Sequence, residues 1–185
     1  MDKSLISRRF AKAVGTYLDK ADVQRYVASR MAELTGRYIP SDIQERVLEI
    51  GCGTGMFTRM YLQQAAPEEM WLNDLCPEVE PYLADVLGEK VHFMAKDAET
   101  LAFPEGQDLI VSCSAVQWFE DLPRFFSGCR KLLHEGGYLA FSTFGPHNTE
   151  EVATLTAAGP ERFRHPYISV VSVAGGTERD AGCTL

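Results

Sequence analysis

Four residues near position 50 have types and spacing suited to ligand binding. Glu49 precedes three glycines at every second position, Gly51, Gly53 and Gly55. Glycine lacks a Cβ, so the backbone there can bend sharply or contact a ligand closely. The apolar run 47–50 before the glycines suits a buried parallel strand, and a helix should follow the turn. A strand, a glycine turn and a helix form the first unit of a nucleotide-binding sheet, whose ligand lies at the carboxyl end of the strand.

The glycine spacing distinguishes two kinds of ligand. Dinucleotide folds carry G-x-G-x-x-G, and here Met56 stands where the third glycine would be. The pattern that begins at Glu49 instead resembles motif I of the class I S-adenosylmethionine (SAM) methyltransferases. SAM has no phosphate, but it has an ammonium and a sulfonium group. Glu49 is suited to the ammonium end, directly or through water, and the resemblance favours SAM over a nicotinamide cofactor.

Acidic residues after the next two strands fit an adenosine ligand. Asp74 ends the expected second strand, where a carboxylate can accept both ribose hydroxyls. The alternative is that Asp74 caps a helix that starts near Pro77. Asp97 and Ala98 follow the third strand. The methyltransferase resemblance implies that the Asp97 carboxylate accepts the adenine amino group and that the Ala98 amide faces the ring.

The segment after the fourth strand is where the methyl group and its acceptor should meet. Trp118 there is either a wall of the acceptor pocket or a core aromatic residue. The candidates for positioning the acceptor are Tyr17, Gln117 and Trp118. The expected cofactor-binding residues are Glu49, Gly51, Cys52, Gly53, Gly55, Asp74, Leu75, Asp97, Ala98 and Ser112. We assign no catalytic triad and expect no metal site.

Composition narrows the class of protein. The 185 residues are enough for one domain, and the net charge of −8 argues against a nucleic-acid-binding protein. The five cysteines are scattered without C-x-x-C spacing, which favours reduced thiols in a cytoplasmic protein over disulfides or zinc. We find neither an export signal nor an apolar run that could span a membrane.

Strands and helices should alternate after the glycine turn. Strands are expected at 69–75, 91–94, 108–113 and 138–143, and helices at 56–65, 77–87, 122–134 and 148–156. This alternation predicts an α/β fold with a doubly wound, mostly parallel, Rossmann-like sheet. We therefore divide the chain into a helical leader (1–40), a SAM-binding core (41–158) and an atypical tail (159–185).

The two ends of the chain carry separate expectations. The leader should be helical over residues 4–36, with Gly36 near its end, and it either covers one sheet face or forms a lid over the cofactor pocket. The tail looks strand-like only at 167–173. The antiparallel hairpin that normally ends a class I methyltransferase core should therefore be incomplete, with at most one further strand.

Several segments give a narrower resemblance, to the malonyl-[acyl-carrier protein] O-methyltransferases. These are 10–17 with 21–24 in the leader, Ser112 with 115–118 and 121–123 after the fourth strand, and 139–145 with 149–151 at the fifth. The match covers roughly residues 4–158; it departs at Cys113, where the family more often has asparagine, and it stops after Ala158. It implies methylation of the free carboxylate of a malonyl thioester on acyl carrier protein, an early step of biotin synthesis.

The resemblance also implies a protein partner. Acyl carrier proteins are acidic, so an acidic chain needs a local basic patch to bind one. Two groups of basic residues could supply it: Lys3, Arg8, Arg9 and Lys12 in the leader, and Arg124, Arg130 and Lys131 further on. The alternative for each is a solvated helix face. Two other functions remain open, a small-molecule carboxyl or carbon methyltransferase and a truncated SAM-binding remnant without activity.

Overall fold

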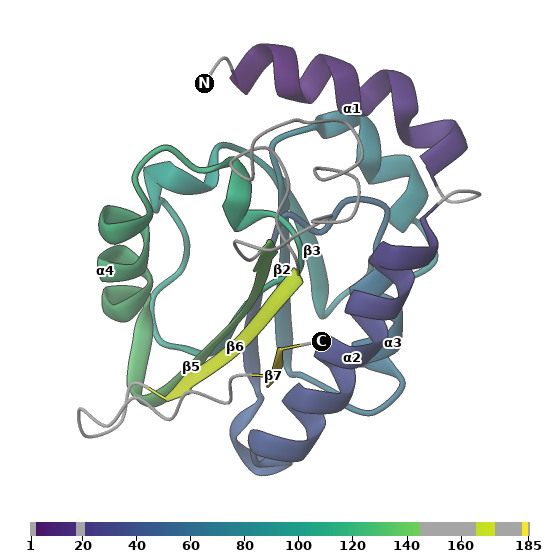
Figure 1. The fold of residues 1–185 in the computed structure, drawn as a ribbon. Coiled ribbons are helices and arrows are strands. Elements are labelled where there is room, and N and C mark those ends of the chain that lie inside the picture. Colours follow the sequence, from purple (N-terminus) through teal and green to yellow (C-terminus); the bar gives the residue numbers. More distant parts are fainter. Residues whose placement is uncertain (1–2, 18–20, 145–165, 173–182, 185) are drawn as a thin grey trace.

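One sheet organises the chain in the computed structural model, which describes residues 3–17, 21–144, 166–172 and 183–184 (Figure 1). The order of its seven strands is β3-β2-β1-β4-β5-β6-β7. The first five strands are parallel, and β6 and β7 are antiparallel to their neighbours. The strands are β1 (Arg46–Ile50), β2 (Glu69–Asp74), β3 (Val91–Ala95), β4 (Gln107–Ser112), β5 (Leu133–Phe144), β6 (Pro166–Ser172) and β7 (Cys183–Thr184). The predicted α/β fold with a mostly parallel sheet is confirmed.

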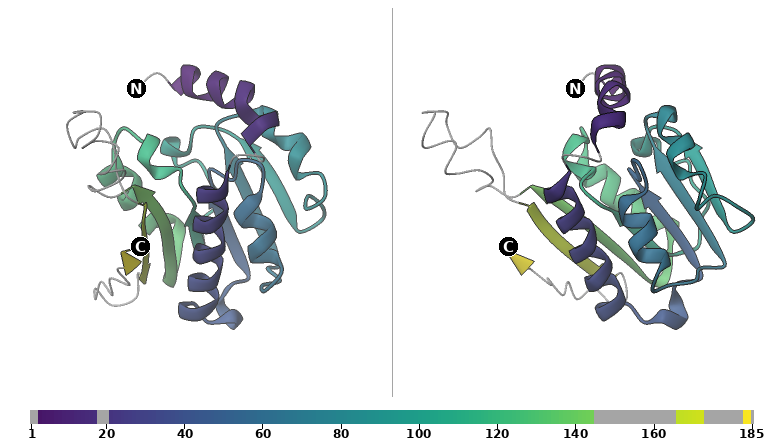
Figure 2. Two further views of the ribbon diagram at one scale, coloured as in Figure 1. Left: turned by 45° about the vertical axis from the view of Figure 1, so that its right-hand side comes forward. Right: turned by 90° about the vertical axis from the view of Figure 1, so that its right-hand side faces the viewer.

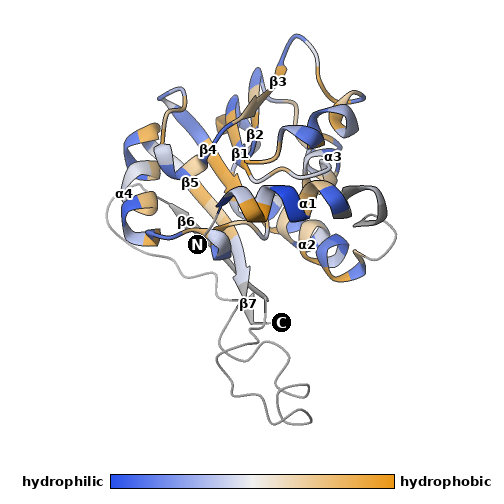
Figure 3. Ribbon diagram, turned by 90° about the horizontal axis from the view of Figure 1, so that it is seen from above, coloured by the Kyte–Doolittle hydropathy of each residue, from blue (hydrophilic) through white to orange (hydrophobic). Residues whose placement is uncertain are grey.

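Successive residues of the central strands point to opposite faces of the sheet and build two apolar clusters. Val47 and Leu109 pack on the face covered by α2 (Asp22–Tyr38) and α3 (Met56–Leu62). Leu48 and Ile110 pack on the other face, against α4 (Leu122–Leu132). Figure 1 shows α4 on one side of the sheet and α2 and α3 on the other, and Figure 3 shows the hydrophobic colour along β4 and β5 between these layers. The layers hold the carboxyl ends of β1, β2 and β4 in fixed positions.

Within the residues that the structure describes, the connections contain four short 3-10 helices. They are η2 (Ser41–Ile43), η3 (Pro77–Leu83), η4 (Ala98–Thr100) and η5 (Val116–Trp118). The helix predicted at 77–87 is wrong in type, because it is the 3-10 helix η3. Pro81 lies inside this segment, and proline lacks the N–H that an α-helix needs while its ring crowds the preceding turn. The helix predicted at 56–65 ends earlier, at Leu62.

The strand predicted at 138–143 begins earlier, at Leu133. The glycine pair at 136–137 lies inside β5 rather than in a turn before it, and Gly136 has a φ of +92°. The pairing register with β4 shifts between Gln107 and Leu109. The strand thus accommodates these glycines through a local irregularity, for which glycine is suited.

The sheet extends beyond β5 further than the sequence predicts. β6 pairs antiparallel with β5 from Tyr138↔Ser172 to Phe144↔Pro166. A second strand, β7, pairs with β6 at two positions, so the expectation of at most one further strand is wrong. The hairpin nevertheless remains short, because β7 contains two residues. The helix expected at 148–156 lies outside the described residues.

The leader forms two helices, α1 (Lys3–Tyr17) and α2. The helix α2 continues through Gly36 to Tyr38, two residues beyond the expected end. Both views in Figure 2 show α1 across one end of the sheet, whereas α2 packs along a face. No helix in the described part of the chain is long and apolar enough to cross a membrane.

Candidate cofactor site

A cavity lies at the carboxyl ends of β1, β2 and β4, beneath α1. The glycine turn after β1, represented by Gly53, forms part of its wall. Asp74 and Asp97 enter it from the ends of β2 and β3, and Ser114 from the segment after β4. Phe10 lines it from α1, which lies above this end of the sheet in Figure 1. This location is the expected ligand position in a doubly wound sheet.

The three glycines of the turn have different roles. All three have positive φ angles, +72° at Gly51, +52° at Gly53 and +78° at Gly55. A Cβ on Gly51 would lie 2.3 Å from the Cβ of Ala115, and one on Gly55 would lie 2.6 Å from Cδ2 of Leu83. A Cβ on Gly53 would lie 3.7 Å from its nearest neighbour, Cζ of Phe10. Phe10 also lines the cavity. Gly51 and Gly55 therefore permit close packing, and Gly53 leaves space on the cavity side.

Asp74 connects the glycine turn to the end of β2. Its Oδ2 accepts a hydrogen bond from the Gly53 N–H at 2.8 Å, and its Oδ1 accepts one from the Cys76 N–H at 2.8 Å. Burial raises the pKa of the Asp74 carboxyl, and these backbone N–H groups partly oppose that shift. Cys76 is the N-cap of η3, which has no side-chain cap hydrogen bond, so the helix-cap interpretation of Asp74 is wrong. Each carboxylate oxygen keeps a further lone pair that can accept a ribose hydroxyl.

Glu49 is a buried carboxyl group within the cavity wall. Its side chain is 1% exposed and its Oε2 accepts a hydrogen bond from the Thr58 hydroxyl at 2.7 Å. The pKa of Glu49 is raised to about 8, mainly by burial and further by the nearby Asp74 carboxylate. The Thr58 hydroxyl and the Arg59 guanidinium lower the pKa and partly oppose this rise. The group therefore carries a proton at neutral pH until a cation enters the cavity. An ammonium group is the kind of ligand that would stabilise its ionised form.

The raised pKa of Glu49 makes stability depend on pH. Between the ordinary glutamate value of 4.5 and about 8, the unfolded chain has lost this proton while the folded chain keeps it. Stability should fall with rising pH across that window and level off above it. We expect the ligand-free protein to unfold roughly 5 °C or more lower at pH 8 than at pH 5. The Glu49→Gln variant, measured by the same thermal melts, should show a clearly smaller difference; an equal difference would contradict this assignment.

Lys3 connects the beginning of α1 to the opposite wall of the cavity. Its Nζ lies 2.7 Å from Oδ2 of Asp97 and 2.5 Å from Oε2 of Glu99. Burial opposes the charge of Lys3, but hydrogen bonds to both carboxylates outweigh burial and raise its pKa. Asp97 also accepts a hydrogen bond from the Glu99 N–H at 3.0 Å through Oδ1. Lys3 therefore faces the cavity. The prediction that it belongs to a basic surface patch is wrong.

The segment after β4 forms the remaining wall. Trp118 lines the cavity and is 48% exposed, so it is not a core residue. The Ser112 hydroxyl is fully buried and the residue is not among those lining the cavity, contrary to its predicted contact with the cofactor. Gln117 is also outside the lining; its Nε2 donates a hydrogen bond to the Ser114 carbonyl at 2.6 Å and supports the turn. The side chain of Tyr17 lies outside the described residues.

The structure brings together most of the predicted cofactor-binding residues. Those that line the cavity are Glu49, Gly51, Cys52, Gly53, Asp74, Leu75, Asp97 and Ala98, whereas Gly55 and Ser112 are not among the lining residues. The sequence interpretation missed the inner face of α1, where Ile6, Ser7 and Phe10 line the cavity together with Lys3. These four residues have the i, i+3, i+4, i+7 spacing of one helix face, which was an available signal.

The lining fits SAM. Three carboxyl side chains line the cavity, those of Glu49, Asp74 and Asp97, and among the described lining residues Lys3 is the one cationic side chain. This balance suits a ligand with ammonium and sulfonium groups, and apolar residues such as Ile50 suit its adenine ring and methyl group. The described residues contain no group of three or more side chains suited to hold a metal ion. The fold and the cavity define a SAM-dependent methyltransferase of class I.

Comparison with known proteins agrees with this assignment to the methyltransferases. The family model of the methyltransferase domain matches residues 48–141. The malonyl-[acyl-carrier protein] O-methyltransferase of Bacteroides thetaiotaomicron is 47% identical over 175 residues, which cover 94% of this chain and 67% of that protein. The chain belongs to the malonyl-[acyl-carrier protein] O-methyltransferase family.

Two further matches show how much of the relatives is covered. The enzyme of the same name from Bacteroides fragilis is 46% identical over 157 residues, or 85% of this chain and 32% of that protein. The chain thus spans between about a third and two thirds of these curated relatives. The crystal structure of a SAM-dependent methyltransferase from Mesorhizobium loti superimposes with a TM-score of 0.54 at 26% identity, covering 62% of this chain and 54% of that chain.

Proposed function

We propose that this chain transfers a methyl group from SAM to the free carboxylate of a malonyl thioester carried on acyl carrier protein. In this proposal the product enters biotin synthesis at an early step. The observation that carries the proposal is the 47% identity to a relative named for this activity, over 94% of the chain. The cavity supports it, because its carboxyl groups suit SAM and its outer wall contains an exposed aromatic residue, Trp118.

The acceptor chemistry requires little from the protein beyond positioning. SAM, when bound, supplies an activated methyl group on a positively charged sulfur. Carboxyl pKa values lie near 4, so a malonyl carboxylate is ionised at neutral pH and needs no general base. The remaining task is to align the carboxylate oxygen with the methyl group and to exclude water. The α1 residues that line the cavity suit the exclusion of water, and Trp118 suits the acceptor side.

The cofactor would be oriented by three carboxyl groups at different strand ends. Glu49 would ionise against the ammonium group, Asp74 would accept the ribose hydroxyls, and Asp97 would accept the adenine amino group. Asp97 already binds Lys3 through Oδ2 and the Glu99 N–H through Oδ1, so the adenine amino group would share one of these oxygens. The carboxyl side chains that would bind the cofactor are thus also the ones that join α1, the glycine turn and the strand ends.

We also assign the protein to the cytoplasm, on the basis of its thiols. Cys52, Cys76, Cys113 and Cys129 are free. Burial raises the pKa of the Cys113 thiol to about 12 and also raises that of Cys52, so both remain protonated and poorly nucleophilic. Free, unreactive thiols in a cofactor cavity suit a reducing compartment.

A comparison of acceptors tests the proposed function. Purified protein would be given labelled SAM and, in parallel, malonyl carrier protein, malonyl-CoA, malonyl-pantetheine and free malonate. We expect malonyl carrier protein to be methylated with the highest kcat/KM, because it provides both the malonyl carboxylate and a protein surface. Highest activity on a free dicarboxylate would instead indicate a small-molecule carboxyl methyltransferase. No methyl transfer to any acceptor, with SAM binding retained, would indicate a SAM-binding remnant.

A further inference from the structure

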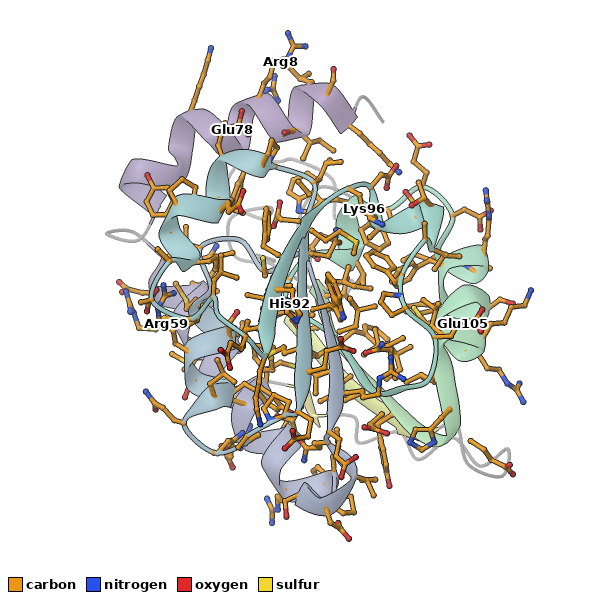
Figure 4. The ribbon with its side chains drawn as sticks, turned by 180° about the vertical axis from the view of Figure 1, so that it is seen from behind. Arg8, Arg59, Glu78, His92, Lys96 and Glu105 are labelled. Atoms are coloured by element: carbon orange, nitrogen blue, oxygen red, sulfur yellow. The ribbon has the colours of Figure 1, made fainter. Side chains whose placement is uncertain are left out.

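The outer face of α1 is basic and exposed. Arg8, Arg9 and Lys12 lie on it, and α1 contains no acidic residue. Within the described residues, none of these three side chains forms an ion pair, and Arg8 bonds only to oxygens of Ser4 one turn earlier. Leu5 lies on the same face and is 39% exposed. Figure 4 shows Arg8 projecting away from the sheet. We call these four residues (Leu5, Arg8, Arg9 and Lys12) the α1 basic face.

The α1 basic face lies directly outside the cofactor cavity. The opposite face of the same helix, which includes Lys3, Ser7 and Phe10, lines the cavity. At 3.6 residues per turn, Arg8 and Lys12 point away from these inner residues. A macromolecule bound to the basic face would therefore be separated from the cavity by the thickness of one helix. A flexible thioester arm on such a partner could reach the cavity past an edge of α1.

The second basic group has a different location. Arg130 and Lys131 are exposed in the last turn of α4, and neither lines the cavity. Cations at a helix C-terminus are favoured by the helix dipole alone, so their presence has a local explanation. The cations of the α1 basic face lie in the body of a helix, where the dipole gives no such explanation. The basic residues of α4 therefore serve as a control for the α1 basic face.

We propose that the α1 basic face is the docking surface for the acidic carrier protein that presents the malonyl thioester. This inference rests on the proposed function. The chain has a net charge of −8 and would repel an acidic partner over most of its surface. Screening at physiological salt limits charge interactions to about 8 Å, so the local charge at the contact decides binding. Three cations around an exposed leucine, next to the cavity, satisfy this requirement.

The test compares two variants that remove the same charge. One is Arg8→Gln with Arg9→Gln, and the other is Arg130→Gln with Lys131→Gln; all four side chains are exposed. Binding of fluorescently labelled malonyl carrier protein would be measured by anisotropy at two salt concentrations, and SAM binding would confirm the fold. We expect the α1 variant to raise the Kd for carrier protein roughly tenfold, with a weaker salt dependence. The α4 variant should change it less than about twofold.

Several results would overturn the proposal. Equal losses in both variants would indicate a general charge effect, and a larger loss in the α4 variant would place the docking surface there. Binding of the α1 face to anionic phospholipid vesicles in preference to carrier protein would indicate a membrane surface. If the wild-type protein methylates malonyl carrier protein and the α1 variant binds it with unchanged Kd, the docking proposal is contradicted. The proposed function would then still stand. Wild-type protein that neither binds nor methylates malonyl carrier protein would contradict the proposed function and docking together.

Discussion

Replacing Gly53 with valine should abolish measurable binding of S-adenosylhomocysteine. Gly53 has a φ of +52° and the Cβ that it lacks would face Phe10 across the cavity wall at 3.7 Å. A branched side chain would occupy the space expected for the cofactor and strain the turn, because β-branched residues rarely adopt positive φ. The loss should exceed a factor of roughly one hundred, or about 2.8 kcal/mol, as measured by titration calorimetry.

Two control variants separate intrusion into the cavity from other effects. Gly88→Ala adds a Cβ with nothing within 4 Å and should leave both stability and binding unchanged. Gly106→Val places the same residue at a positive φ, +74°, where the nearest atom is Nη1 of Arg46 and not the cavity wall. It should lower the melting temperature but preserve binding. If the folded Gly53 variant binds normally, the turn does not contact the cofactor.

Replacing Asp74 with alanine should weaken binding of S-adenosylhomocysteine by roughly thirty- to one hundredfold, or about 2–3 kcal/mol. The variant loses the expected ribose hydrogen bonds. It also leaves the Gly53 N–H without its acceptor at 2.8 Å, so the turn would be less well held. Affinity measured by calorimetry and stability measured by thermal melts should therefore both decrease.

An analogue of S-adenosylhomocysteine without the two ribose hydroxyls separates these two contributions. Wild-type protein should bind this analogue much more weakly than the parent compound. The Asp74→Ala variant should bind the two ligands with affinities within about threefold of each other, because the shared interaction is already lost. If removal of the hydroxyls costs the variant as much as the wild type, Asp74 acts only by holding the Gly53 backbone.

The central sheet was the most predictable part of the fold. The apolar runs at 47–50 and 108–113 have the composition of buried parallel strands, and the structure places them side by side as β1 and β4. The cavity residues at the ends of β1 and β2 could be predicted for the same reason, since carboxyl ends of parallel strands meet at one edge. Glu49 and Asp74 line the cavity as their positions predict.

The wrong predictions concern features that are determined by tertiary contacts. Helical spacing separates the face of Lys3 from that of Arg8, but only the tertiary position of Asp97 and Glu99 across the cavity gives Lys3 its ion pairs there. Ser112 was expected to face the cofactor, but it is the last residue of β4 and its side chain is buried in the sheet layer. Strand pairing by β6 and β7 depends on a distant segment meeting the edge of β5, which local patterns do not specify.

The contacts of Lys3 also bear on how the protein is labelled. This residue lies in the first turn of α1, and its ammonium group is 2.7 Å from a carboxylate in the cavity wall. A reagent that acylates lysine side chains would remove this charge and place a new group beside the cofactor cavity, close to Asp97 and Glu99. Lys131, which is exposed in α4 and does not line the cavity, could react without this consequence.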